Sequence, residues 1–323
     1  MTRSRLRCGL AAALAATAIS SLAAAQTAPL LPGDAALRAR YALPASRFMM
    51  IDGESVHYVD EGRGPPVVLI HGSFASLRQW DGWARVLARH YRVIRFDKSP
   101  DGLSGPNPQG DYTVARRIAV IDKLTRKLGA DRFILVATSS GGYEAAGFAA
   151  DHPERVKALV LNNVSVGEPP LDMSTFSPAL KAALADDAPR HGHHVTEYWR
   201  QILIHVFHDG GKVTPALVQE WTDLNNRAVL MPPSAATTAA AADHARTADD
   251  LHRITAPTLL LWSADDPETT LAKDAQETQG LLGSHDKAIV VIPDCGHEMP
   301  MECSDAGVTR ALPFLARITA AKR

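Results

Sequence analysis

The chain has 323 residues, 46% of them hydrophobic, and a formal net charge of −1 at neutral pH. A chain of this length can bury a large core, either as one big domain or as a domain with an insertion. The near-zero charge gives no basis for binding nucleic acid or an anionic membrane surface. Its three cysteines do not make a disulfide framework, although Cys295 and Cys303 can pair if the protein is exported.

The first 25 residues have the features of a secretory signal peptide. Three arginines precede an apolar run rich in Ala and Leu, which ends at residue 25 in small side chains that suit a cleavage site. The alternative is an uncleaved membrane anchor, but an alanine-rich run with three hydroxyl residues is a poor bilayer span. We therefore expect residues 1–25 to be removed, and the mature protein, without a membrane span, to be periplasmic or secreted.

The next part of the chain alternates between strand and helix patterns. Residues 26–46, with three prolines, are expected to form a surface lead-in. Two short strands, 47–51 and 54–60, flank the dipeptide Asp52-Gly53, which is typical of a β-hairpin turn. The elements expected after the hairpin are a strand at 66–70, a helix near 80–87, a strand at 91–96 and an amphipathic helix at 112–128.

Residues 132–143 read as a buried strand, a tight turn of small residues and the start of an alanine-rich helix. A serine at the apex of such a turn is a nucleophile elbow, in which the residues two before and two after the serine must be small. Ala137 and Gly141 meet that condition for Ser139, whereas counting from Ser140 would place the branched Thr138 at a small position. Because alanine replaces the usual glycine at 137, a plain Ser/Gly-rich β–α turn is the alternative interpretation.

The strand and helix alternation resumes after a long interruption. A strand is expected at 156–162, and two more at 258–262 and 288–292, which together indicate a parallel sheet covered on both faces. Between them, residues 167–252 contain only helical patterns. We predict a helical cap over 167–252, inserted after the sixth strand of a core domain formed by residues 26–166 and 253–323. The helical patterns of this cap cover residues 177–185, 196–207 and 215–228.

By these features the chain resembles the α/β-hydrolase superfamily, in its capped branch of esterases, lactonases and carbon–carbon bond hydrolases. The resemblance implies a mostly parallel eight-stranded sheet flanked by helices, with the helical cap after strand 6. It also implies the order Ser, Asp, His for the catalytic residues. The matching pieces are His71-Gly72, Trp80, Asp97 with Gly102 and Ser104, residues 139–142, residues 262–266, and Cys295-Gly296-His297.

The chemistry of a serine nucleophile identifies its expected partners. A serine hydroxyl needs a base within hydrogen-bonding reach, and His297, in a loop directly after the last strand, is suited to that role. A carboxylate must then orient the imidazole. Asp265 and Asp266 both follow the strand that ends at Trp262, and the family's usual spacing selects Asp266, with Asp265 as the alternative.

An oxyanion hole needs two backbone N–H groups. The resemblance assigns them to Ser140, the residue after the nucleophile, and to Ser73, in the loop after His71-Gly72. Relatives usually carry a bulkier residue at the position of Ser140. We expect His71 to brace this loop rather than to transfer protons. Pro100 replaces the first glycine of the family's Asp-x-x-Gly loop, which should change the course of that loop beside the site.

The sequence therefore predicts a serine hydrolase that acts through an acyl-enzyme on small, largely apolar esters or lactones. The alternatives are a carbon–carbon bond hydrolase or enol-lactonase, and a non-catalytic binding protein with the same fold. No cofactor and no metal is implied, and His191, His193 and His194 are expected to be solvated rather than to bind a metal. A small-molecule substrate is the expected partner, and the sequence leaves the oligomeric state open.

Overall fold

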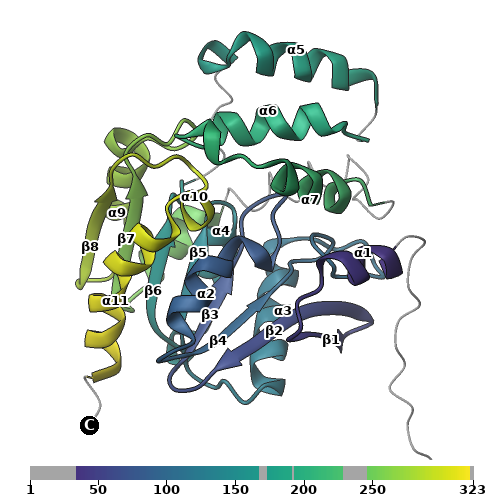
Figure 1. Cartoon of the computed structure of the whole chain (residues 1–323). Helices are drawn as coiled ribbons and strands as arrows, with labels where there is room; N and C mark the ends of the chain where they lie inside the picture. The colour runs from purple at the N-terminus through teal and green to yellow at the C-terminus, as the bar shows by residue number, and fades with distance from the viewer. Residues whose placement is uncertain (1–33, 167–172, 191–192, 228–245, 321–323) are drawn as a thin grey trace, which may run out of the picture.

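The computed structural model describes residues 34–166, 173–190, 193–227 and 246–320. Its centre is an eight-stranded sheet with the strand order β1-β2-β4-β3-β5-β6-β7-β8 (Figure 1). Only the pairings of β2 are antiparallel, so the remaining strands run side by side in one direction. The strands are β1 (Ser46–Ile51), β2 (Glu54–Gly62), β3 (Pro66–Ile70), β4 (Arg92–Phe96), β5 (Phe133–Thr138), β6 (Val156–Asn162), β7 (Thr258–Ser263) and β8 (Lys287–Ile292).

All eight predicted strands are present, and their bounds differ from the prediction by only one or two residues. The strand signals were reliable because the inner strands are buried on both faces, which gives continuous apolar runs bounded by polar turns. The predicted hairpin is also confirmed. Asp52 and Gly53 both have positive φ angles and join β1 to β2, in the manner of the turns that favour this dipeptide.

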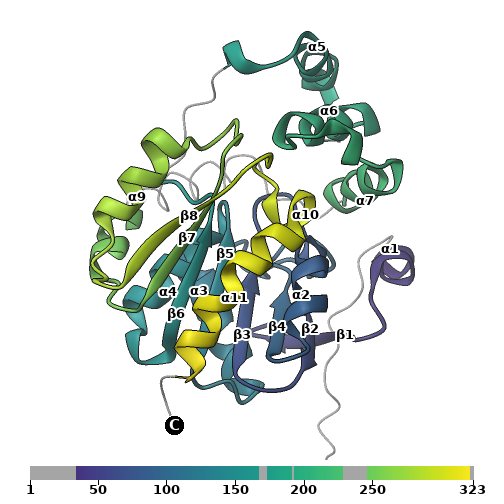
Figure 2. The same ribbon diagram turned by 60° about the vertical axis from the view of Figure 1, so that its left-hand side comes forward.

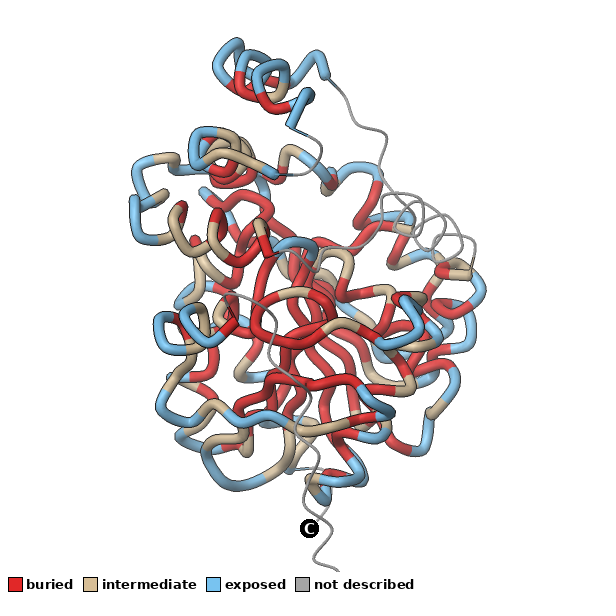
Figure 3. The backbone as a smooth tube through the Cα atoms, turned by 90° about the vertical axis from the view of Figure 1, so that its right-hand side faces the viewer, coloured by how far each residue is buried: buried red, intermediate tan, exposed pale blue. Residues whose placement is uncertain are grey.

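Two layers of helices cover the two faces of the sheet. Alternate strand residues define the faces: Val68 and Leu135 belong to one apolar cluster, and Val67 and Val136 to the other. The first face is covered by α3 (Val114–Lys127), α4 (Gly141–Asp151) and α9 (Gln276–Leu281), and the second by α2 (Asp81–Leu87), α10 (Met299–Glu302) and α11 (Ser304–Ala320). The buried tube at the centre of Figure 3 is this core. Shorter helical turns lie at Leu77–Trp80, Pro153–Arg155, Met173–Thr175, Ala188–Arg190, Gly210–Lys212 and Leu271–Ala275.

Among the described residues between β6 and β7, three of the helices stand over one end of the sheet (Figures 1 and 2). They are α5 (Pro178–Asp187), α6 (Thr196–Val206) and α7 (Pro215–Asn225), and they form the helical insertion that the sequence predicts. The cap has its own apolar cluster, which includes Trp199 and Trp221 and is joined by Ala75 of the core. The exact bounds 167 and 252 stay a prediction, since parts of the insertion lie outside the described residues.

The lead-in predicted for residues 26–46 is wrong in part, because residues 34–41 form a helix, α1 (Asp34–Tyr41). This helix is held against the cap. Asp34 pairs with the buried Arg227 at 3.0 Å, and Tyr41 donates a 2.5 Å hydrogen bond to Asp223 of α7. Its eight residues carry no continuous apolar stripe, so the local pattern gave no helix signal.

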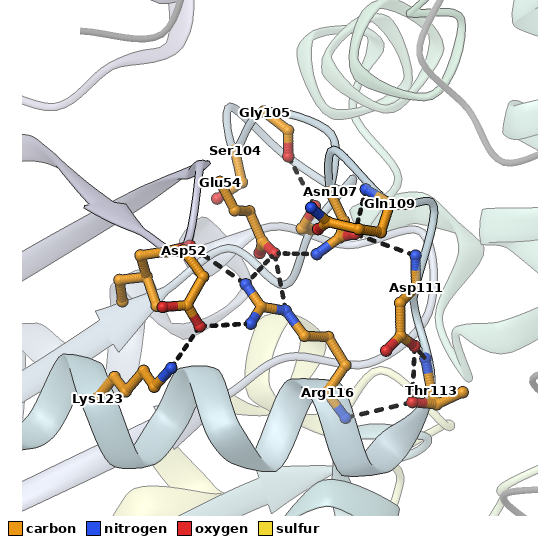
Figure 4. A network of polar contacts seen from close by, with 12 residues as sticks. Asp52, Glu54, Ser104, Gly105, Asn107, Gln109, Asp111, Thr113, Arg116 and Lys123 are labelled. Atoms are coloured by element: carbon orange, nitrogen blue, oxygen red, sulfur yellow. Dashed lines mark hydrogen bonds and ion pairs between the residues drawn. The ribbon is translucent and has the colours of Figure 1, made fainter. Parts of the chain in front are cut away.

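A polar network joins the β1–β2 hairpin to the N-terminal end of α3 (Figure 4). Arg116 in the first turn of α3 donates to Asp52 at 2.8 Å and to Glu54 at 3.0 Å. Asn107 donates to the same Glu54 carboxylate at 3.1 Å and so ties in the loop that precedes α3. These contacts support the edge of the sheet.

Within the described ranges no helix is long and apolar enough to cross a membrane; the predicted signal peptide lies outside those ranges.

Candidate active site

The turn between β5 and α4 has the geometry of a nucleophile elbow. Ser139 follows the last residue of β5 and has a φ of 49°, a conformation that non-glycine residues rarely adopt without a functional reason. Its backbone N–H is bonded to the carbonyl of Asn162 at 3.0 Å, which holds the turn against β6. A Cβ at Gly141 would lie 2.6 Å from the carbonyl oxygen of His71, so that position needs glycine. Ser139 therefore lies at the apex of the turn.

The structure brings Ser139, His297 and Asp266 into one hydrogen-bonded chain. Ser139 Oγ lies 2.9 Å from His297 Nε2, and His297 Nδ1 lies 2.8 Å from Asp266 Oδ2. Asp266 is buried and also accepts from the backbone N–H and the hydroxyl of Thr269. With its carboxylate fixed in this way, Asp266 can hold Nδ1 protonated and leave Nε2 free to accept the serine proton.

The alternative acid, Asp265, points elsewhere. Its carboxylate lies 3.2 Å from Nδ1 of His208, and nearly half of its side chain is exposed. Of the two carboxylates, Asp266 is therefore the one that contacts His297.

Two carboxylates set the charge of the histidine. Burial by itself would lower the pKa of His297, but the negative charges of Asp266 and Glu268 raise it above its ordinary value. Burial likewise opposes ionisation of Asp266, yet the interactions with His297 and Thr269 hold the pKa of Asp266 below its usual range. Glu268 lies on the other side of the ring, with Oε2 3.2 Å from His297 Nε2. The sequence analysis did not single it out.

The loop after β3 lies next to the serine. A Cβ at Gly72 would lie 3.1 Å from Ser139 Cβ, so the loop passes close to the nucleophile. His71 braces it as predicted: Nδ1 donates to the carbonyl of Gly72 at 2.7 Å, and Nε2 accepts from the N–H of Lys98 at 2.8 Å. Burial and the nearby Lys98 charge lower the pKa of His71 to about 4, which keeps the ring neutral.

The two predicted oxyanion residues face each other. Ser73 Oγ lies 2.9 Å from Ser140 Oγ, and Ser73 is exposed beside Phe74, which has a φ of 60°. The backbone N–H groups of Ser73 and Ser140 have no partner among the described hydrogen bonds, which leaves both available to an oxygen above Ser139. In the loop that follows β4, Pro100 is joined to Ser99 by a cis peptide bond.

Two buried side chains that the sequence analysis missed support this arrangement. Gln79 accepts from the N–H of Gly72 at 2.9 Å and donates to Glu298 at 2.5 Å, so it links the oxyanion loop to the residue that follows His297. Burial raises the pKa of Glu298 to about 7. The residues are 219 positions apart, and no local pattern could have paired them.

The histidine loop is also tied to the cap and closed by a disulfide. Glu302 accepts from the backbone N–H groups of Gly296, His208 and Asp209 at 2.8, 3.0 and 2.7 Å. Cys295 and Cys303 are bonded to each other, so the pairing that the sequence left open is formed. His297 lies inside the loop that this disulfide closes.

Of the histidines expected to be solvated, His193 is exposed, but the expectation is wrong for His194, whose side chain is mostly covered by its neighbours. His194 pairs with Asp187 at 2.6 Å and stacks on Tyr198, while His191 lies outside the described residues. Elsewhere, His208, Asp265 and Asp294 lie within 4.8 Å of one another on the surface. Exposed acidic groups often meet in this way without a metal.

Comparison with known proteins places this site in a family. Residues 65–302 match the family model described as alpha/beta hydrolase fold. The chain belongs to this family. Together with the Ser-His-Asp geometry, the match makes it a serine hydrolase.

Several relatives found by sequence cover most of the chain. It is 27% identical over 282 residues to a 2-hydroxy-6-oxo-6-(2'-aminophenyl)hexa-2,4-dienoic acid hydrolase of Metapseudomonas resinovorans, covering 84% of this chain and 91% of that one. It is 26% identical over 287 residues to a 2-hydroxy-6-oxononadienedioate/2-hydroxy-6-oxononatrienedioate hydrolase of Klebsiella pneumoniae, covering 84% and 96%. The enol-lactonase from Burkholderia xenovorans LB400 has the same fold, with a TM-score of 0.68, 22% identity and coverage of 84% and 100%.

Proposed function

We propose that this protein hydrolyses small, largely apolar esters or lactones through an acyl-enzyme on Ser139. The observation that carries the proposal is the hydrogen-bonded chain from Ser139 through His297 to Asp266, built on an elbow whose serine is partly accessible. A buried acid, a buried base and an accessible hydroxyl in this order are the requirements of acyl transfer.

The steps follow from the geometry. His297 Nε2 takes the proton of Ser139 as Oγ bonds to the carbonyl carbon, and the carbonyl oxygen becomes an oxyanion held by the N–H groups of Ser73 and Ser140. The bond to the leaving oxygen then breaks, and His297 gives its proton to that oxygen, releasing an alcohol. In a lactone this alcohol stays attached to the acyl group. His297 next takes a proton from water as the water oxygen bonds to the acyl carbon. The bond from that carbon to Ser139 Oγ then breaks, His297 returns the proton to Oγ, and the carboxylic acid is released.

The surroundings of the serine support an apolar substrate. Phe74 is exposed beside the site, with its ring centroid 5.4 Å from that of Trp199 in α6. Phe176 and His205 of the cap pack together at 4.8 Å, and His205 lies within electrostatic range of His297. An apolar lining of this kind favours uncharged acyl groups, because a charged group would lose its hydration without compensation.

Carbon–carbon bond hydrolysis is the second candidate. The two relatives described above are named as hydrolases of dienoic acids, whose carboxylates need a cationic partner. Among the described cap residues, Lys181, Arg190, Arg200 and Lys212 are exposed, and the buried Arg227 is paired with Asp34. No free cation of the described cap residues is therefore buried over the serine. This favours esters and lactones over dienoic acids.

Steady-state kinetics would separate these candidates. We expect kcat/KM on a p-nitrophenyl ester series to peak at short or medium acyl chains, with turnover of some lactones. Turnover confined to vinylogous diketones would transfer the assignment to carbon–carbon hydrolysis. A purified protein that turns over none of these compounds, and whose activity matches that of Ser139→Ala, would instead be a binding protein with this fold.

We further propose that the protein is exported after cleavage behind residue 25. The Cys295–Cys303 disulfide supports an oxidising compartment, where such bonds persist. The intact mass of the protein from the periplasm or medium should correspond to a chain beginning at Gln26. A mass that retains the three N-terminal arginines would exclude this.

A further inference from the structure

A buried lysine lies behind the two oxyanion residues. Lys98 Nζ is 3.2 Å from Ser140 Oγ, and Ser140 Oγ is 2.9 Å from Ser73 Oγ. An ammonium group carries only donors, so Lys98 donates the first of these bonds. The three side chains thus form a hydrogen-bonded chain from a buried cation to the exposed Ser73.

One hydroxyl proton in the hydrogen-bonded series Lys98–Ser140–Ser73 has no acceptor within that series. The two serine hydroxyls carry two protons, and the bond between them uses one. Among the described residues, neither hydroxyl has a further acceptor. Both hydroxyls can donate or accept, because a hydroxyl proton rotates, so the bond between the two serines can run from Ser73 to Ser140 or the other way. Lys98 occupies a lone pair of Ser140, and aligned bonds polarise one another, which favours the arrangement in which Ser140 donates to Ser73 and Ser73 donates onward. The free O–H then lies on Ser73, in the loop that passes close to the nucleophile at Gly72.

Charge neutralisation alone does not explain the position of Lys98. Its side chain is 2% exposed, and its nearest carboxylate is that of Glu144, which is 1% exposed, at 3.6 Å. Glu144 already has a closer cation, Arg117, at 2.9 Å. Lys98 Nζ is nearer to Ser140 Oγ than to Glu144. In a buried setting its charge is weakly screened and acts strongly on the hydroxyl that it contacts.

We propose that Lys98, Ser140 and Ser73 form a third oxyanion donor, in which the Ser73 hydroxyl, polarised through Ser140 by the buried ammonium, donates to the carbonyl oxygen of the substrate. This rests on the proposed function, because it assumes attack by Ser139. Ser73 touches the reacting oxygen, whereas the side chains of Lys98 and Ser140 position and polarise its hydroxyl. The donation strengthens as negative charge develops, so it stabilises the transition state more than bound substrate.

The test is the rate at which a fluorophosphonate probe inactivates the protein, since its phosphoryl oxygen enters the same hole whatever the natural substrate. Ser73→Ala, Ser140→Ala and Lys98→Met should each lower kinact/KI by about tenfold to 100-fold, at or below the loss caused by removing an oxyanion donor. The loss should lie in kinact rather than in KI. Because Lys98 acts through the Ser140 hydroxyl, the variant with both Lys98→Met and Ser140→Ala should react no more slowly than Ser140→Ala alone.

Two controls distinguish this role from a structural one. The thermal midpoint is the first: Ser73→Ala and Ser140→Ala, which leave Glu144 paired with both Lys98 and Arg117, should show their loss in kinact with a thermal midpoint close to that of the wild type. Lys287→Met, on a lysine at the start of β8, should leave kinact/KI unchanged.

The outcomes separate the two proposals. If Ser73→Ala and Ser140→Ala react like the wild type, or if Lys98→Met costs as much without the Ser140 hydroxyl as with it, the third donor is refuted while the serine hydrolase assignment stands. If the probe does not label Ser139 of the wild type at all, both proposals fail. Should Lys98→Met not fold, the two serine variants and their thermal midpoints still decide the matter.

Discussion

Replacing Glu268 by glutamine should move the acidic limb of the activity profile to lower pH. Glu268 Oε2 lies 3.2 Å from His297 Nε2, the nitrogen that must be unprotonated to accept the proton of Ser139. A negative charge at that place favours the imidazolium form and raises the pKa of His297. Removing it lowers this pKa, so the neutral base is present at more acidic pH and activity persists there.

The size of the shift follows from the distance and the exposure. The Glu268 side chain is 43% exposed, so the interaction is screened by water and a dielectric constant near that of the solvent applies. Two unit charges at this separation then interact by about 1 kcal/mol. Since one pKa unit corresponds to about 1.4 kcal/mol, the midpoint of the limb should fall by up to about one pH unit. High salt should shift the wild-type limb in the same direction.

The assay is a pH profile of kcat/KM on a p-nitrophenyl ester from pH 4 to 9. Asp286→Asn serves as the matched control, because it removes one carboxylate at the start of β8, where Asp286 pairs with Arg317. Its limb should coincide with that of the wild type. A limb that stays in place in Glu268→Gln, or that moves to higher pH, would refute the electrostatic reasoning about His297.

Three more predictions concern the triad and the disulfide. Ser139→Ala should abolish labelling by a fluorophosphonate, whereas Ser140→Ala should be labelled more slowly on Ser139; a label on residue 140 in the wild type would show the elbow register to be wrong by one. Asp266→Asn should keep the fold but lower kcat by about 10⁴-fold, while Asp265→Asn, whose side chain contacts His208, should be within a few-fold of the wild type; kinetics giving the opposite order would move the acid role to Asp265. Cys303→Ser should lower the free energy of unfolding in urea by about 2 kcal/mol, because the disulfide closes a short loop; an unchanged midpoint would mean that the bond does not form in solution.

The fold could be predicted because its signals are local. Buried strands have continuous apolar sequences, and tight turns need particular residues, as at Asp52-Gly53. The elbow shows in the sequence for the same reason, because its small residues stand within one strand–turn–helix segment, although the contact that requires glycine at 141 is with the carbonyl of His71 in the loop after β3. His297 could be found from its position in the loop that follows the last strand.

The supporting contacts could not be predicted, because they join residues far apart in the chain. Nothing around Gln79 shows that it bonds to Glu298, and nothing around Lys98 shows that its ammonium reaches Ser140. Such pairs depend on how the loops at one end of the sheet come together, which local periodicity does not describe. The helix α1 was missed for a related reason, since contacts with α7 rather than an apolar stripe stabilise it.

These long-range contacts also indicate how the cap acts on catalysis. The cap does not merely stand over the site, because Glu302 binds the backbone of His208 and Asp209 together with that of Gly296, the neighbour of His297. A Cβ at Gly296 would lie 2.4 Å from the carbonyl oxygen of Val206, so the end of α6 packs directly on the histidine loop. Any displacement of α6 must therefore be transmitted to the position of the base. Proton transfer from Ser139 requires Nε2 within hydrogen-bonding reach. It follows that side chains of the cap influence kcat through the placement of His297, in addition to selecting the substrate through the lining near Phe74.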